Sequence, residues 1–287
     1  MSDFVASRII SVGIEIDRVL NIYKDLDVSV VGEKTTSARN DTCEINIKGI
    51  KQENLANLTN YFYDTNKPIR VRVEYGREGS PLSLLYFGET LNSESKGSAV
   101  DVLSNSIKLI CGTGVTGKNK LTSVSLPKGV SLQEASQDIA KSLGVGLKFD
   151  ASNISLNGFV LNSDAYSGIE KLNKNVNINA FLDGEFLVVK NKNGVRDNQV
   201  IVLNKNSGML GVPKRLATSK PKTATEKQSQ IEVSWLADRV PVVGGAVRIE
   251  SERVPSANGL WIIDKLRFNL ENRANNWFFT AECTKYD

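Results

Sequence analysis

Apolar and polar side chains alternate over much of this chain, and the pattern is clearest from Ile231 to the C-terminus. A period of two means that each strand buries one face. Because the connections are short, consecutive strands are expected to pair antiparallel, and Asn258-Gly259 can supply the positive φ angles of a tight hairpin. The pattern predicts four strands that end the chain in a small antiparallel barrel or sandwich, at Ile231 to Trp235, Val243 to Ile249, Leu260 to Leu270 and Trp277 to Cys283.

The same alternation fills residues 1–112, with one helical segment inserted. Leu55, Leu58 and Phe62 recur at helical spacing within 51–64, so one short helix is expected to pack on the sheet. The stretches 17–24 and 32–42 are predicted to be polar connections. This region is predicted to be a β-rich barrel with one helix, with strands at Ile10 to Ile16, Leu26 to Val30, Cys43 to Ile47, Ile69 to Tyr75, Leu84 to Thr90, Ala99 to Leu103 and Ser106 to Cys111.

The pattern of apolar positions changes in residues 113–206, where helical and strand spacings follow each other. It predicts a small α+β domain. Ser131 with Glu134 three residues later forms a capping box, and apolar residues follow at helical spacing until Gly144. A second helix is expected over 164–174. Strands are expected at Leu147 to Phe149, Val176 to Leu182 and Glu185 to Lys190, the last two joined by Asp183-Gly184, a strong hairpin signal.

Residues 207–287 return to strands, interrupted by 217–229. That segment carries almost no apolar side chains and cannot offset its ordering entropy, so it is predicted to be a mobile loop. The fold class expected for the whole chain is therefore α+β and β-rich, with two antiparallel β-barrel domains flanking a small α+β domain.

Composition excludes several kinds of chemistry. The 287 residues include no histidine, which removes the commonest general base and zinc ligand. The net charge of +4 is small and mixed in sign, so it does not argue for nucleic-acid binding. Cys43, Cys111 and Cys283 are far apart in the sequence and are expected to be buried thiols in a protein made in a reducing cytoplasm. No signal peptide and no membrane-spanning segment is expected.

The stretch from Gly112 to Asn119 resembles both a dinucleotide fingerprint and a phosphate-binding loop, with Asn119 where a magnesium-ligating Ser or Thr should stand. Both motifs require a helix to begin there, because the helix N-terminus holds the phosphate. Residues 121–127 show no helical period, so this stretch is interpreted as a flexible interdomain linker. No catalytic, cofactor-binding or metal-binding residue is predicted, and no cofactor.

Acidic, tryptophan and basic residues on the predicted strands are further candidates, and each also fits a purely structural position. Glu74, Glu89, Glu250 and Glu282 lie on the polar phase of their strands, where a carboxylate pair or a solvated face is equally consistent with one sequence. Trp235 and Trp277 follow the apolar phase and are expected in the core, whereas Trp261 falls off that phase and is the better candidate for a contact with another chain. The basic residues Arg70, Arg72 and Lys48 fit either a solvated sheet face or a subunit interface.

Several short motifs resemble the baseplate hub proteins of contractile-tailed bacteriophages. The stretch Ser207 to Pro213 matches a "G-(ML/LI)-G-x-P" motif that precedes a strand, an "x-P-x-x-G" turn and another strand, here Ile231 to Trp235, Pro241 to Gly245 and Val247 to Ile249. The final strands are matched by Gly259, Trp261 and Ile263 and by Asn275 to Trp277. The first half follows the same order with Cys43 to Gly49, a helix, Val71 to Tyr75 and Phe87-Gly88-Glu89. A departure is Trp235 to Asp238, where that family has "LLNP".

The resemblance implies a structural virion protein without catalytic activity. Its two barrels would be tube-like domains related by duplication, and a homotrimer would place six of them in a ring that joins the six-fold tail tube to the three-fold spike. The implied partners are the central spike protein, the tail tube protein and other baseplate proteins, with DNA passing through the channel only in transit. The protein would be assembled in the host bacterial cytoplasm and reside in the tail baseplate.

Two other functions are kept as alternatives. A carbohydrate-binding distal-tail or receptor-binding module would display clusters of exposed aromatic side chains. A tail enzyme that degrades cell wall would use a carboxylate pair, although hub assemblies usually carry such activity on a partner or an appended domain.

Overall fold

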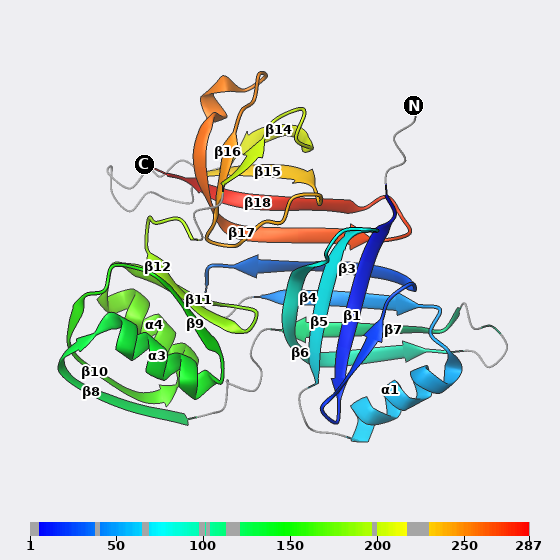
Figure 1. Cartoon of the computed structure of the whole chain (residues 1–287), viewed down its shortest axis with the longest axis horizontal. Coiled ribbons are helices and arrows are strands. Elements are labelled where there is room, and N and C mark those ends of the chain that lie inside the picture. The colour runs from blue at the N-terminus through cyan, green and yellow to red at the C-terminus, as the bar shows by residue number, and fades with distance from the viewer. Residues whose placement is uncertain are drawn as a thin grey trace. The chain divides into compact units, whose positions relative to one another are not determined.

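The computed structural model shows a β-rich protein of the α+β class (Figure 1), which confirms the predicted fold class. It describes residues 6–37, 41–64, 69–97, 101, 104–112, 121–196, 200–216 and 230–286. The chain forms two compact units. The first comprises Met1–Glu33, Asp41–Thr116 and Phe268–Phe278, and the second comprises Lys34–Asn40, Gly117–Arg267 and Phe279–Asp287. The division into three domains at residues 112 and 206 stays a prediction.

The first unit is built on one antiparallel sheet. Its strands lie in the order β3-β4-β7-β6-β5-β1-β2, and the end of β17 adjoins β3. The helix α1 (Gln52–Asp64) buries Leu55 and Leu58. The bounds are β1 (Arg8–Ile16), β2 (Val19–Tyr23), β3 (Asp27–Thr35), β4 (Thr42–Lys48), β5 (Arg70–Arg77), β6 (Ser83–Lys96) and β7 (Ser106–Gly112).

Alternation explains why these strands form one sheet. The apolar phase of β1, β4, β5 and β7 is almost completely buried, including Ile10, Ile45, Val71 and Leu109, while the intervening side chains are polar or partly exposed. Alternate residues point to opposite sides of a strand, so a period of two places one face in the core. Strand β2 (Val19–Tyr23) is the exception, because it lies within residues 17–24, which were predicted to be a polar connection. That prediction was wrong.

In the second unit, the C-terminal strands lie in the order β14-β15-β18-β17, with β16 paired to β17 and β13 paired to β16. Strand β15 therefore neighbours β18 and not β16, so the expected pairing of consecutive strands holds only from β16 onward. The bounds are β13 (Val200–Leu203), β14 (Met209–Arg215), β15 (Gln230–Leu236), β16 (Ala246–Ile249), β17 (Gly259–Glu271) and β18 (Trp277–Lys285).

The connection from β16 to β17 is longer than the predicted tight hairpin. A short 3-10 helix, η2 (Pro255–Ala257), precedes Asn258, whose φ is −65°, and only Gly259 has a positive φ, of 131°. The predicted mobile loop at 217–229 and the predicted strand at Ala99 to Leu103 lie outside the described residues, apart from Asp101.

The second unit also contains an α+β layer with its own apolar core. Figure 1 shows α3 (Leu132–Leu143) and α4 (Ala165–Asn175) between two small sheets, and each helix contacts strands of both. One sheet pairs β8 (Leu121–Ser131) with β10 (Ser155–Asp164), and the other has the order β11-β12-β9. Its strands are β9 (Gly146–Asp150), β11 (Ile178–Asp183) and β12 (Phe186–Asn191).

The predicted helix signals in this layer are confirmed. Glu134 N donates to Ser131 Oγ at 3.2 Å, and Ser131 N donates to Glu134 Oε2 at 2.9 Å, so the capping box closes in both directions. Gly144 ends the helix in the left-handed region, with φ 72°. The hairpin at Asp183-Gly184 also forms, joining β11 to β12.

Candidate interaction surfaces

Each unit carries a polar sheet face with ion pairs. In the first unit, the outward side chains of β4 and β7 are partly or fully exposed, and Lys108 Nζ lies 3.0 Å from Glu44 Oε1. Lys48 Nζ lies 3.7 Å from Asp27 Oδ2 on the neighbouring strand β3, and Arg72 pairs with Glu74 along β5. Exposed pairs of this kind contribute little to stability.

In the second unit, Arg267 on β17 joins two carboxylates from neighbouring strands. Its guanidinium pairs with Glu232 of β15 at 3.2 Å and with Glu282 of β18. Ser234 and Thr280 share a hydrogen bond of 2.8 Å on the same strands. The candidate carboxylate Glu282 is thus held by a cation, and Glu74 likewise pairs with Arg72.

The hairpin formed by β1 and β2 exposes apolar side chains at a sheet edge. Val19, Leu20 and Ile22 are 62%, 50% and 62% exposed, although all three are large aliphatic residues. Its two-residue turn has positive φ at both Asp17 and Arg18, 48° and 67°. Such angles cost a non-glycine residue roughly 1–2 kcal/mol. The turn that positions β2 therefore carries an unfavourable conformational free energy.

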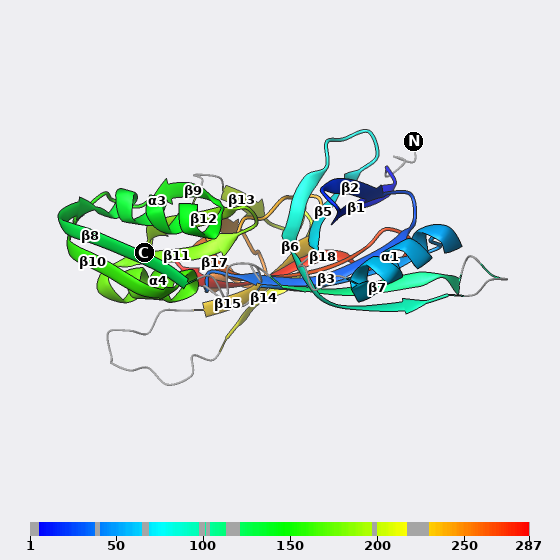
Figure 2. The ribbon, with the colours of Figure 1, turned by 90° about the horizontal axis from the view of Figure 1, so that it is seen from below.

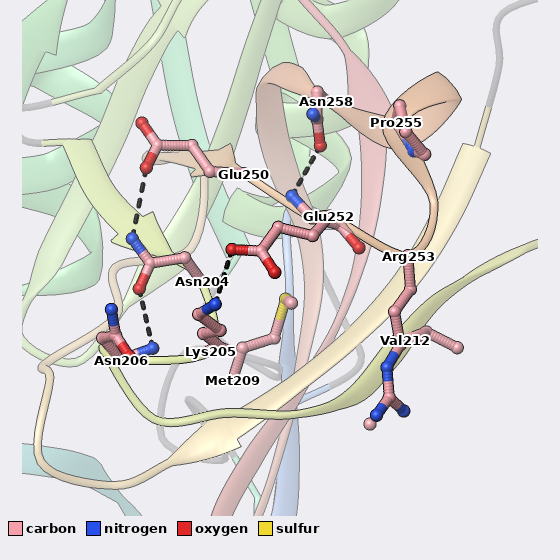
Figure 3. Close-up of a pocket in the computed structure, with 12 residues that line it drawn as sticks. Asn204, Lys205, Asn206, Met209, Val212, Glu250, Glu252, Arg253, Pro255 and Asn258 are labelled. Carbon is pink, nitrogen blue, oxygen red and sulfur yellow. Dashed lines mark hydrogen bonds and ion pairs between the residues drawn. The ribbon is translucent and has the colours of Figure 1, made fainter.

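A cavity of about 840 Å³ lies beside the edge strand β14 in the second unit. Figure 3 shows its lining from the turn before β14, from β14 itself and from the loop after β16. Lys205 pairs with Glu252 at 2.7 Å, and Asn204 Nδ2 donates to Glu250 Oε2 at 3.2 Å. The apolar part of the lining is Met209, Val212 and Pro255.

Three residues of the family-like "G-(ML/LI)-G-x-P" stretch, Met209, Gly211 and Val212, therefore line this cavity. Gly211, from the same stretch, has φ 69° and interrupts regular pairing, because the register between β14 and β15 shifts between Leu210 and Lys214. The sequence pattern gave no sign of the cavity, since its second wall comes from residues 250–258, about forty positions later.

A buried ion cluster lies deeper in the second unit. Asp183, at the end of β11, pairs with Arg196 at 2.5 Å and with Lys34, and all three side chains are largely buried. Burial by itself would raise the pKa of the Asp183 carboxyl, but the charges and hydrogen bonds of Lys34 and Arg196 hold that pKa well below its usual value. The carboxylate is therefore ionised at neutral pH.

The same cluster holds the turn at Pro241 to Gly245. Arg196 N donates to the carbonyl oxygen of Gly244 at 2.9 Å. Gly244 has φ 78°, and a Cβ there would lie 3.0 Å from the Phe181 ring. The sequence reasoning missed this arrangement, because Lys34, Asp183 and Arg196 are too widely separated along the chain for a motif.

Two further charged groups lie in this unit, Lys190 on β12, which is buried, and Asp264 on β17, which is partly buried. The Lys190 ammonium donates to the carbonyl oxygen of Gly194 at 2.8 Å. Burial lowers the pKa of Lys190, and burial also raises the pKa of Asp264, which accepts a hydrogen bond of 2.5 Å from Thr284. A small cavity of about 150 Å³ adjoins Asp264 and Thr284.

All three tryptophans are buried, including Trp261, which was expected to contact another chain. Trp235 and Trp277 are buried, as predicted. The guanidinium groups of Arg8 and Arg77 lie over the Trp277 ring, at 5.4 and 5.7 Å from the ring centroid. Trp261 is only 2% exposed and donates to the Ala257 carbonyl oxygen at 2.9 Å, so its predicted role in a contact with another chain was wrong. The turn at residues 255–258 shields it despite its phase.

The nucleotide-like stretch and the three cysteines were the other candidates from the sequence. Residues 113–120 lie outside the described residues, and the next described element is strand β8 from Leu121, where nucleotide motifs would need a helix. The cysteines are buried thiols, as predicted. Cys43 of β4 lies directly opposite Cys111 of β7, and burial raises the pKa of Cys111 to about 12. Over the described residues, no helix has the length and apolar character that crossing a membrane requires.

The other predicted positions do not form one cluster. Glu89 is buried on β6 and lies opposite Arg70 of β5, and Glu250 follows β16 at the cavity. Arg70, Arg72 and Lys48 all lie in the first unit, where Arg70 is 4.0 Å from Glu15. Basic and acidic groups therefore alternate on this face rather than forming a basic patch.

Comparison with solved structures finds this fold in tail and secretion proteins. A tail protein from Neisseria meningitidis MC58 matches with a TM-score of 0.66 at 10% identity, over 96% of each chain. A component of the Escherichia coli type VI secretion system, described as similar to the T4 bacteriophage tail proteins gp27 and gp5, matches with a TM-score of 0.62 at 9% identity, over 91% of this chain and 74% of that one.

A Francisella PdpA–VgrG complex contains a chain that matches with a TM-score of 0.63 at 9% identity, over 99% of this chain and 59% of that one. At such identities these likenesses establish the fold alone. Comparison with curated proteins gives no match. The model of the family described as baseplate hub gp41 matches residues 9–283. This chain therefore belongs to the baseplate hub gp41 family, and its role is that of a structural component of the phage tail baseplate.

Proposed function

We propose that this protein is the hub of a phage tail baseplate and acts as a homotrimeric ring without catalytic activity. The ring joins the six-fold tail tube to the three-fold spike, and the first and last β-barrel domains of three chains supply its six similar domains. The single observation that carries the proposal is the family match over residues 9–283. Most homo-oligomers have closed symmetry, and a closed ring leaves no sheet edge open where neighbouring domains pair or pack edge to edge.

The polar sheet faces support this role. Both units present exposed strands on which acidic and basic groups are paired, such as Glu44 with Lys108 and Glu232 with Arg267. A channel wall with balanced charge does not retain a polyanion, because retention requires clustered cations. DNA would therefore pass these faces in transit rather than bind to them.

The proposed partners follow from the position of a hub. They are the central spike protein, the tail tube protein and other baseplate proteins, in a virion assembled in the host cytoplasm. The Francisella relative is part of a complex that contains VgrG, which supports a spike-like partner.

Measurement of native mass by light scattering tests the proposal, on the purified chain alone and with its candidate spike. Three copies of the 31.4 kDa chain have a mass of about 94 kDa, and negative-stain images should show a ring with an open centre. A monomer in both samples would contradict the hub role.

The carbohydrate-binding alternative loses its main candidates, since Trp235, Trp261 and Trp277 are all buried. Binding of the purified chain to a glycan array would nevertheless favour it. For the cell-wall enzyme, the test is peptidoglycan hydrolysis that disappears when one Glu, such as Glu89, is replaced by Gln.

A further inference from the structure

Two of the three cysteines meet across neighbouring strands of the first unit. Cys43 of β4 lies directly opposite Cys111 of β7, and both side chains are thiols. The register of these two antiparallel strands runs without a shift from Thr42 to Lys48. Side chains of directly opposite residues project from the same face of a sheet, so the two sulfur atoms share one side. Cys283 belongs to the second unit, on β18.

The hydrogen-bond pattern sets how far apart the two Cα atoms lie. Gly49 N donates to the carbonyl oxygen of Asn105 at 2.8 Å, and these residues continue the register of β4 and β7. Hydrogen-bonded pairs recur at every second residue of an antiparallel ladder, so Cys43 and Cys111, an even number of residues further along, form one as well. The Cα atoms of such a pair are about 5.5 Å apart, which is inside the range of about 4.4–6.8 Å that disulfides span.

The pair is enclosed in the core of the first unit. Cys43 and Cys111 are 1% and 0% exposed, on the same buried phase as Ile45 and Leu109. Figure 2 shows α1 and the β1–β2 hairpin on one side of the layer that contains β3 and β7. Burial raises the pKa of Cys111 to about 12, so little of this thiol is ionised at neutral pH. Thiol exchange in the folded protein is therefore slow and requires local opening.

We propose that Cys43 and Cys111 are a redox-sensitive pair that closes into an intrachain disulfide between β4 and β7 under oxidising conditions. The oxidant is a low-molecular-weight disulfide. One cysteine thiolate attacks it and displaces one thiol, and the second cysteine then attacks the mixed disulfide and displaces the other thiol. Two electrons pass from the two cysteine sulfurs to the small disulfide, and the two protons leave on its thiols.

The geometry favours a bond that can be reversed. Directly opposite Cβ atoms in a sheet are about 4.5–5.5 Å apart, whereas those of a disulfide are about 3.8 Å apart, so closure has to draw β4 and β7 together. A strained disulfide is more easily reduced than a relaxed one. The timing rests on the proposed function, because a virion protein is made in a reducing cytoplasm and meets oxidising surroundings after release. The bond itself lies within one chain and does not depend on the trimer.

Thiol counting on the full-length wild-type chain tests the pair. The protein is equilibrated in mixtures of reduced and oxidised glutathione, with dilute urea to speed local opening, and is then denatured, alkylated and weighed by mass spectrometry. All three thiols should react after equilibration with a large excess of reduced glutathione, and only Cys283 after equilibration with oxidised glutathione. Peptide mapping should then find Cys43 joined to Cys111.

Three results would overturn the proposal. They are three reactive thiols in every mixture, glutathione adducts without a protein disulfide, and a bond that includes Cys283. A pair that stays oxidised in excess reduced glutathione would contradict the redox sensitivity.

Cysteine variants supply the controls. Cys283→Ala should keep the bond in the same mixtures, whereas Cys43→Ala should abolish it. A disulfide constrains the unfolded chain, so oxidation should raise the melting temperature of wild type by about 5 °C and leave that of Cys43→Ala unchanged. Melting curves of the reduced variants establish that they fold. A linked wild type that melts no higher than the reduced protein would contradict the expected stabilisation of the first unit.

The disulfide and the hub function fail separately. Three reactive thiols in every mixture, in a chain that forms a trimer, overturn the disulfide and leave the hub. A chain that is monomeric even with its spike contradicts the hub, while the thiol count still decides the disulfide.

Discussion

The chain handles charge in two contrasting ways. Inside the second unit, Asp183 is enclosed by Lys34 and Arg196, and the cluster anchors the turn at Gly244. On the sheet face of the first unit, Glu44 and Lys108 form an ion pair at 3.0 Å that stays open to solvent. Both sites join a carboxylate to basic side chains, but Asp183 is buried with two cations, whereas Glu44 has one cation and stays open to solvent.

The difference separates structural charges from surface charges. Two opposite charges 4 Å apart interact by about 1 kcal/mol in water and about 4 kcal/mol at the effective dielectric near a protein surface. Removing one partner of a buried pair also leaves the other charge without compensation. The buried cluster is therefore expected to hold the fold, and the exposed pairs to give the sheet face a balanced charge toward other molecules.

The largest effect should follow from Asp183→Asn. The variant removes the carboxylate that pairs with the buried guanidinium of Arg196 and with the ammonium of Lys34, so the free energy of unfolding should fall by about 3–5 kcal/mol. Urea unfolding followed by circular dichroism measures it. The matched control Glu282→Gln leaves Arg267 with Glu232 on an open face. If both variants lose the same stability, the contrast between the two settings is wrong.

The pH dependence of the Asp183 contribution has a definite sign. Because the pKa of Asp183 is lowered in the folded state, the unfolded chain binds a proton first as pH falls. The stabilisation that the Asp183 carboxylate contributes is fully present above the unfolded pKa of about 3.9. It is lost progressively as pH falls from there toward the lower folded-state pKa. The stability difference between wild type and Asp183→Asn should therefore shrink from pH 5 to pH 3. A difference that is constant over this range would contradict the assignment.

Local patterns were enough to predict the elements whose stabilisation is local. The alternation in β5 and the capping box at Ser131 both appear as predicted. Strand β2 was missed, because its apolar residues do not alternate. Trp261 was misplaced, because shielding by residues 255–258 depends on a turn rather than on strand phase. The Asp183 cluster and the β14 cavity bring together residues from distant segments, and no short-range pattern encodes them.

A smaller effect is expected from Gly244→Ala, at the turn that the buried cluster anchors. The residue has φ 78°, and the added Cβ would meet the Phe181 ring at 3.0 Å and Lys190 Cε at 3.2 Å. The left-handed conformation alone should cost about 1–2 kcal/mol, measured as a lower urea midpoint. Gly211→Ala is the control, since it has a positive φ but no atom near the added Cβ. A larger loss at Gly211 would show that packing at Gly244 is not limiting.

The smallest change should come from Glu44→Gln on the exposed face. The variant removes the charge that faces Lys108 but leaves both side chains in solvent, so the unfolding free energy should change by only about 0.2–1 kcal/mol, and less at high salt. Denaturant unfolding at low and high salt measures both. A loss as large as that of Asp183→Asn would mean that this face is structural. A near-neutral result would mean that Glu44 serves the charge balance of this face and not its stability. A Glu44→Lys variant, which makes the face basic, should then retain DNA in a salt-dependent way.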